Sequence, residues 1–265
     1  MSYVRFLAAQ AEAEPSPFPR CQDLPPGSYI EEAPPVGQVY VVSYTWSATD
    51  HPSPGGAKMR ELAAVLDRLG ASDDGGVFFD FPSLPQGGGK RPDIYLSTNP
   101  YARKAPLLEE LDGRNEEEVA RFKFALFETT RLYAYGGSKV IVLPDKDDVS
   151  SFPDVGEVTE KLNDFCEPPR METHSNWGFT KKMGYENSGW CCAEFAIAKR
   201  NGTIVNMDDA PVQRVLKSRE WPNTATEYAA MMESKEQPVH FTKKGDAEAV
   251  RFNFFKNAYS LIGED

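Results

Sequence analysis

A tryptophan and a glutamate lie four residues apart in the segment SGWCCAE, at residues 188–194. If this segment is a helix, Trp190 and Glu194 share one face, because residues i and i+4 lie one turn apart. A carboxylate held beside an indole ring can stabilise positive charge that develops during a reaction. From the spacing alone, however, an ordinary glutamate on an exposed helix surface is the simpler interpretation.

Aromatic and hydroxyl side chains gather near the expected ends of β-strands. The residues Ser43-Tyr44-Thr45-Trp46 end the first expected strand, and residues 80–89 follow the second. Ligands of an open parallel sheet bind beyond the carboxyl ends of its strands. Rings at this edge can stack on a base or nicotinamide, and hydroxyls can bond to a sugar. The candidate rings are Trp46, Phe81, Trp177 and Trp190, and the candidate hydroxyls are those of Ser43, Thr45 and Ser83. Most of these rings, taken singly, are better explained as members of a hydrophobic core.

Composition excludes several classes of protein. The chain has 265 residues, of which 40% are apolar, and a formal net charge of −11. A surface with this much negative charge repels phosphate backbones and anionic lipids. We therefore expect neither nucleic acid nor membrane as a partner. No apolar run approaches the roughly 18–20 residues that span a bilayer, and residues 1–10 do not read as a signal peptide. We expect a cytoplasmic protein.

Cysteine and histidine residues show no metal-binding pattern. Neither the four cysteines nor the three histidines have the spacing of a zinc site, so we expect no metal. They are Cys21, Cys166, Cys191, Cys192, His51, His174 and His240. The run GGGKR at residues 87–91 lacks the spacing of a phosphate-binding P-loop.

The pattern of apolar residues predicts alternating strands and helices. Five β-branched or aromatic segments, typical of buried strands, lie at residues 39–44, 76–81, 139–143, 203–207 and 239–242. Helical periodicity is found over residues 57–69, from Asn115 to Gly136, and over 188–200, 211–219, 224–233 and 246–262. This alternation predicts an α/β domain with a flavodoxin-like, five-stranded parallel sheet and helices on both faces.

Two regions depart from this alternation. Residues 1–37 contain seven prolines, which disfavour both helix and central strand, and we expect an extended arm there. Residues 38–265 then form a single domain. Residues 145–187 form a long insert after the third strand, which can cover a site at the edge of the sheet.

Four sequence windows together resemble a TIR-type domain. They are VVSYTW at 41–46, VFFDFPSLPQ at 77–86, TTRLYAYGGSKVIVLPD at 129–145 and SGWCCAE at 188–194. Their order is most similar to that of divergent TIR-like proteins of protists and algae. The WCxxE element is shared with plant TIR immune receptors. The resemblance covers about residues 38–262.

The resemblance implies an activity and a site. Enzymatic TIR domains cleave NAD+ at the nicotinamide–ribose bond, and Glu194 matches their essential glutamate, with Trp190 as its tryptophan. Residues 81–92 match the BB loop, and residues 43–46 match the strand end that lines the nicotinamide. NAD+ is then the substrate, no cofactor is needed, and TIR–TIR contacts between copies are expected.

Two other functions fit the same residues. One is a TIR-like protein-interaction module without catalysis, and the other is an enzyme like the nucleoside deoxyribosyltransferases, which also uses a glutamate in a flavodoxin-like fold. NAD+ cleavage suits a single carboxylate, because the cationic nicotinamide leaves as a neutral molecule without a general acid. The carboxylate stabilises the oxocarbenium-like transition state.

Overall fold

The computed structural model is a mixed α/β fold built on a small parallel sheet. It describes residues 2–13, 19–21, 24–30, 32, 34–46, 52–53, 56–86, 114–145, 184–241 and 246–259. Three strands, β1 (Val39–Tyr44), β2 (Gly76–Phe78) and β3 (Ser138–Leu143), pair in the order β2-β1-β3. The central strand β1 pairs with β3 along its whole length, from Val39 opposite Ser138 to Tyr44 opposite Leu143. Tyr44 and Leu143 therefore mark the carboxyl edge of the sheet.

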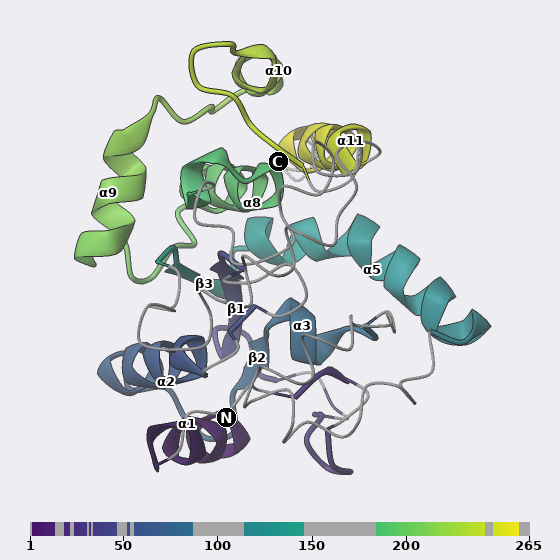
Figure 1. The fold of residues 1–265 in the computed structure, drawn as a ribbon, viewed down its shortest axis with the longest axis vertical. Coiled ribbons are helices and arrows are strands. Elements are labelled where there is room, and N and C mark those ends of the chain that lie inside the picture. The colour runs from purple at the N-terminus through teal and green to yellow at the C-terminus, as the bar shows by residue number, and fades with distance from the viewer. Residues whose placement is uncertain are drawn as a thin grey trace, which may run out of the picture.

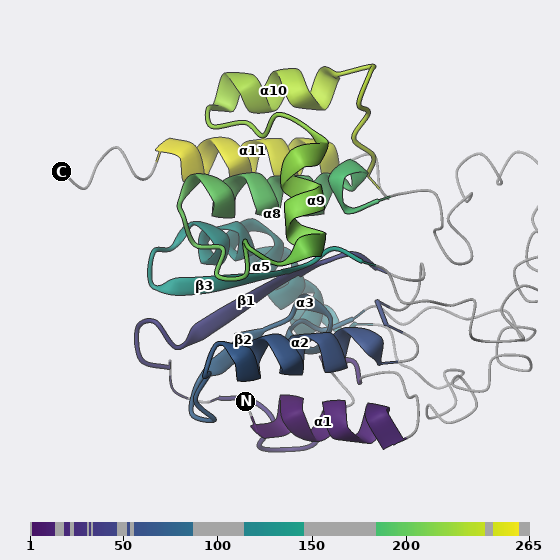
Figure 2. The same cartoon turned by 90° about the vertical axis from the view of Figure 1, so that its left-hand side faces the viewer.

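Helices cover both faces of this sheet, as Figures 1 and 2 show. One face carries α2 (Ala57–Arg68), with α1 (Ser2–Ala13) packed outside it. The other carries α5 (Glu116–Ala134) and α8 (Gly189–Arg200), with α11 (Asp246–Tyr259) and then α10 (Ala225–Glu233) beyond them. Shorter or lateral elements are α3 (Asp80–Ser83), η4 (Tyr185–Asn187) and α9 (Ala210–Ser218).

Alternate residues of β1 enter two separate hydrophobic cores. Val41 belongs to the core beneath α5 and α8. Tyr40, Val42 and Tyr44 belong to the core beneath α2. Successive side chains of a strand point to opposite faces, so Ser43 lies on the α8 side together with Val41.

The expected fourth and fifth strands are wrong for the described residues, which form only isolated bridges there. The backbone of Ile204 forms a parallel bridge with Val140 of β3. The next contact with β3, at Val142, is made by the side chain of Asn206 instead of by backbone. The Asn206 amide accepts from the Val142 N–H and donates to the Val142 carbonyl, both at 2.9 Å. Because this amide replaces a backbone pair, the chain leaves the sheet after one bridge. The segment 239–241 pairs instead with the start of α8, where His240 bridges Ser188.

The expected extended arm over residues 1–37 is wrong for its first part, which forms the helix α1. All seven prolines come after this helix ends at Ala13, so none of them interrupts its hydrogen bonds. Arg5 fixes α1 to the rest of the fold through Asp67 at 2.7 Å, the Ala71 carbonyl at 2.9 Å, and Asp73.

Most of the remaining elements are confirmed. The Asn115–Glu118 capping box opens α5, and Gly70 and Gly202 adopt positive φ beyond the ends of α2 and α8. The second strand is shorter than expected, because the chain turns into α3 at Asp80. No helix in the described part of the chain combines the length and apolar character that a membrane span needs.

Candidate active site

The Glu194 carboxylate lies against the end of β1. The Ser43 hydroxyl donates to Glu194 Oε2 at 2.5 Å. The same hydroxyl is 2.5 Å from the Tyr185 hydroxyl, and Ser43 itself is fully buried. Sequence and fold explain this meeting: Ser43 is the penultimate residue of β1, and Glu194 lies in the second turn of α8, which crosses that end of the strand.

Burial makes Glu194 hard to ionise. Loss of solvation, together with the negative charge of Asp80, raises the pKa of its carboxyl from the ordinary 4.5 to about 8. Hydrogen bonds from Ser43 and Tyr133 act in the opposite direction, because they stabilise the anion. The residue nevertheless keeps some exposed surface. Glu194 is thus a partly buried acid whose protonation changes near neutral pH, a property typical of functional carboxyls.

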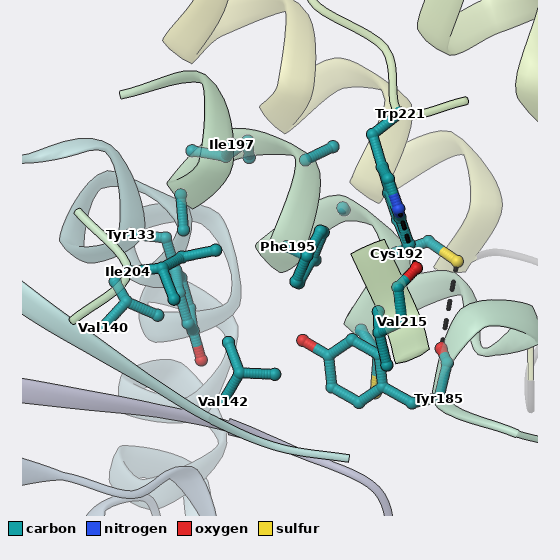
Figure 3. Packing of buried hydrophobic residues seen from close by; sticks show 14 of the residues in the cluster. Tyr133, Val140, Val142, Tyr185, Cys192, Phe195, Ile197, Ile204, Val215 and Trp221 are labelled. Atoms are coloured by element: carbon teal, nitrogen blue, oxygen red, sulfur yellow. Dashed lines mark hydrogen bonds between the residues drawn. The ribbon is translucent and has the colours of Figure 1, made fainter. Parts of the chain in front are cut away.

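Two tyrosines complete the surroundings of Glu194. Tyr133 of α5 and Tyr185 of η4 belong to the core between the sheet and the helices α5 and α8, as Figure 3 shows. The Tyr133 hydroxyl lies 3.1 Å from the Val42 carbonyl oxygen, so its single proton is shared between that carbonyl and the Glu194 carboxylate. Burial raises the pKa of both phenols, and the charge of Glu194 raises it further. Both therefore stay protonated and can only donate or relay hydrogen bonds.

A second carboxyl lies on the opposite face of β1. The Tyr44 hydroxyl donates to Asp80 Oδ1, and the Tyr44 ring stacks on Phe79 with centroids 4.1 Å apart. Burial raises the pKa of Asp80, and the bonds from Tyr44 and the Phe81 amide partly offset that rise. The two carboxyls, Asp80 and Glu194, therefore flank the last residues of β1.

The structure brings only some of the expected site residues together. Thr45 donates to the Pro144 carbonyl at 2.8 Å, so its hydroxyl ties β1 to the end of β3. Trp46 and Phe81 form an edge-to-face pair at 5.6 Å, on the α2 side of the sheet. The Trp190 indole donates to Asp246 of α11 at 3.2 Å. Ser43 is the expected residue that the structure places directly on Glu194.

Three residues of this arrangement were not among the expected site residues. Asp80 and Tyr133 lie inside the windows that resemble TIR domains, so the position of Asp80 just after a strand was an available signal. Tyr185 lies at the end of the segment treated as an insert, and nothing in its sequence indicates that it folds back onto β1. Trp177, residues 87–92 of the expected BB loop, and residues 146–183 of the insert lie outside the described residues.

In the part of the chain that the structure describes, the two cysteines of α8 and the possible metal ligands show no sign of a second site. Burial raises the pKa of the Cys191 thiol well above its usual range and that of Cys192 to about 12, so neither forms a thiolate at neutral pH. Within the described ranges, no three histidine, cysteine or acidic side chains are grouped so that they could hold a metal ion.

The arrangement can therefore supply one ionisable carboxyl at the carboxyl edge of a parallel sheet, oriented by a serine and surrounded by hydroxyl groups. No family model, no curated protein and no solved structure matches the chain.

Proposed function

We propose that this protein is a TIR-like NAD+ glycohydrolase with a flavodoxin-type fold, in which Glu194 promotes cleavage of the nicotinamide–ribose bond. The observation that carries the proposal is the 2.5 Å hydrogen bond from Ser43 to Glu194 at the carboxyl edge of the sheet. This edge is where parallel α/β folds bind their ligands. The sequence resemblance independently selects the same two positions.

The ionised form of Glu194 is the active one in this mechanism. As the nicotinamide–ribose bond breaks, positive charge moves from the pyridinium ring onto the ribose, and a nearby carboxylate stabilises it. The nicotinamide leaves as a neutral molecule, so no general acid is required. The free enzyme is mostly protonated at Glu194 at pH 7, because the pKa of the carboxyl is about 8. The cationic substrate favours ionisation, since an opposite charge nearby lowers the pKa of an acid.

Each neighbouring group has a part in this mechanism. Ser43 fixes the direction of the carboxylate and passes on the hydrogen bond of Tyr185. Trp190, one turn from Glu194 on α8, is the candidate for stacking on the nicotinamide ring of NAD+. The Trp46–Phe81 pair lies on the α2 side of the sheet, across the strand end formed by Tyr44 and Thr45, and is the candidate for a part of NAD+ that extends beyond that end. We also propose that copies associate through TIR–TIR contacts, in line with the resemblance.

The proposal is tested by a panel of substrates at pH 9, where Glu194 is ionised. Purified protein is incubated separately with NAD+, with NADH, and with deoxyadenosine plus a free base, and the products are separated by chromatography. We expect nicotinamide from NAD+ and none from NADH, because the reduced ring is neutral and leaves poorly. If the deoxynucleoside exchanges its base and NAD+ is not cleaved, the protein is a deoxyribosyltransferase-like enzyme instead. No product from any of the three would leave a non-catalytic interaction module.

A further inference from the structure

Two consecutive residues of β1 each hold a carboxyl, one on either face of the sheet. Ser43 donates to Glu194 on the α8 side, and Tyr44 donates to Asp80 on the α2 side. Neighbouring strand residues share a peptide bond but point in opposite directions. A displacement of Tyr44 is therefore transmitted directly to the Ser43 hydroxyl.

Helix α8 contacts both of these strand residues. Glu194 accepts from the Ser43 side chain, and the Cys191 thiol donates to the Tyr44 carbonyl at 3.3 Å. Residues 191 and 194 lie one turn apart on the helix, so they form a matched pair of contacts with residues 43 and 44. Helix α8 is thus held against the strand at Tyr44 as well as at Ser43.

Tyr44 is fixed from the far side of the sheet. Its ring is buried and stacks on Phe79, and its hydroxyl ends on Asp80, the first residue of α3. Asp80 is itself held in the α3 turn, where its carbonyl accepts from the Leu84 N–H at 2.8 Å. The carboxyl of Asp80 therefore anchors the tyrosine to a separate element.

We propose that Asp80 is a positioning residue for Glu194: by holding Tyr44, it keeps the neighbouring Ser43 hydroxyl on the Glu194 carboxyl. The catalytic role of Glu194 in this assignment rests on the proposed function; the positioning by Asp80 does not. The coupling between the two carboxyls is a property of the free protein, and it can be measured without substrate.

The groups around Glu194 determine in which direction a change at Asp80 or Ser43 shifts the pKa of Glu194. The groups that shift the pKa of Glu194 are Ser43 from β1, Tyr133 from α5 and Asp80 from α3, and none of them is basic. Tyr44 from β1, Tyr185 from η4, and Cys191 and Cys192 from α8 also face its charge, and all four remain neutral because burial raises the pKa of each. Asp80 raises the pKa of Glu194 through its charge, whereas Ser43 lowers it through a hydrogen bond. Losing the Asp80 charge therefore lowers the pKa of Glu194, whereas losing the Ser43 hydrogen bond raises it, so the direction of the pKa change tells the two effects apart.

The test follows the side-chain carboxyl of Glu194 by carbon NMR through a pH titration of the full chain. Tyr44→Phe keeps the stacked ring and both carboxyls but cuts the bond to Asp80. We expect the pKa of Glu194 to rise, because the Ser43 hydrogen bond is loosened, and Ser43→Ala sets the full size of that rise. A folded Tyr44→Phe protein with an unchanged Glu194 pKa would overturn the proposal.

Asp80→Asn is the complementary variant. An asparagine oxygen still accepts from Tyr44 but carries no charge, so the pKa of Glu194 falls, by about half a pH unit or more. Asp74→Asn, at an exposed residue before β2, is the matched control and leaves the pKa of Glu194 unchanged.

If Asp80→Asn does not fold, the wild-type protein supplies the measurement: the Asp80 carboxyl signal shows a second inflection where Glu194 ionises. Its absence would overturn the coupling. Lack of NAD+ cleavage would overturn the proposed function and leave this result untouched.

Discussion

Replacing Glu194 with glutamine reduces the rate of nicotinamide release from NAD+ by several hundred-fold or more at pH 9. Glutamine has the size of glutamate and still accepts the Ser43 hydrogen bond, but it carries no negative charge. Electrostatic stabilisation by one well-placed group is worth about 3–4 kcal/mol in the transition state, which corresponds to a factor of a few hundred. Initial rates of wild type and Glu194→Gln, measured by chromatography at equal protein concentration, test this prediction.

The matched control is Glu220→Gln, which removes the charge of an exposed glutamate just beyond α9. We expect its rate to equal that of the wild type. Circular dichroism confirms that both variants are folded before the rates are compared. Equal release by Glu194→Gln and by the wild type would remove Glu194 from the mechanism.

The same substitution stabilises the protein at high pH. In the folded chain the pKa of Glu194 is about 8, against an ordinary value of 4.5, so the folded chain holds this proton more tightly than the unfolded chain does. Between pH 4.5 and pH 8 the folded chain binds more protons than the unfolded chain does. The free energy of unfolding therefore falls as the pH rises through this interval. Over the whole interval the loss amounts to up to about 5 kcal/mol. Glutamine cannot ionise and avoids this loss.

Urea denaturation at pH 5 and pH 9 measures the effect. The free energy of unfolding of the wild type should drop between the two pH values by more than that of Glu194→Gln, and the variant should be the more stable protein at pH 9. At pH 5 the two proteins should differ little, because Glu194 is protonated in the folded chain. A variant less stable than the wild type at pH 9 would show that Glu194 contributes to stability rather than opposing it. Function at the expense of stability is common for active-site residues.

Elements with strong local signals could be predicted from the sequence, and those decided by distant contacts could not. The capping box of α5 and the glycines after α2 and α8 are readable because they depend on residues a few positions apart. The segment 203–207 has the composition of a strand, but a side chain 64 residues from its partner decides its pairing, since the Asn206 amide takes the place of backbone on Val142. Helix α1 was missed because the prolines that follow it dominate the composition of the first 37 residues.

The same division holds for the site. Ser43 and Glu194 were both selected from the sequence, one by its place at a strand end and the other by its motif, and the structure joins them. Tyr44, Trp46 and Phe81 were expected beside them, but all three belong to the core on the α2 side of the sheet. Alternation along β1 places Tyr44 there, whereas Trp46 follows the strand and Phe81 lies in α3. Tyr185 reaches Ser43 across 142 residues of chain, which no local pattern reveals.

The most direct measurement for the whole account is the pH titration of the Glu194 carboxyl itself, by carbon NMR, with and without a cationic nicotinamide. The 1-methylnicotinamide cation, methylated on the ring nitrogen, carries the positive ring of NAD+ without the glycosidic bond, and neutral nicotinamide is its control. We expect a pKa of about 8 for the Glu194 carboxyl in the free protein, lowered by the cation and unchanged by the neutral ring. A pKa near 4.5, or one that does not respond to the cation, would contradict it.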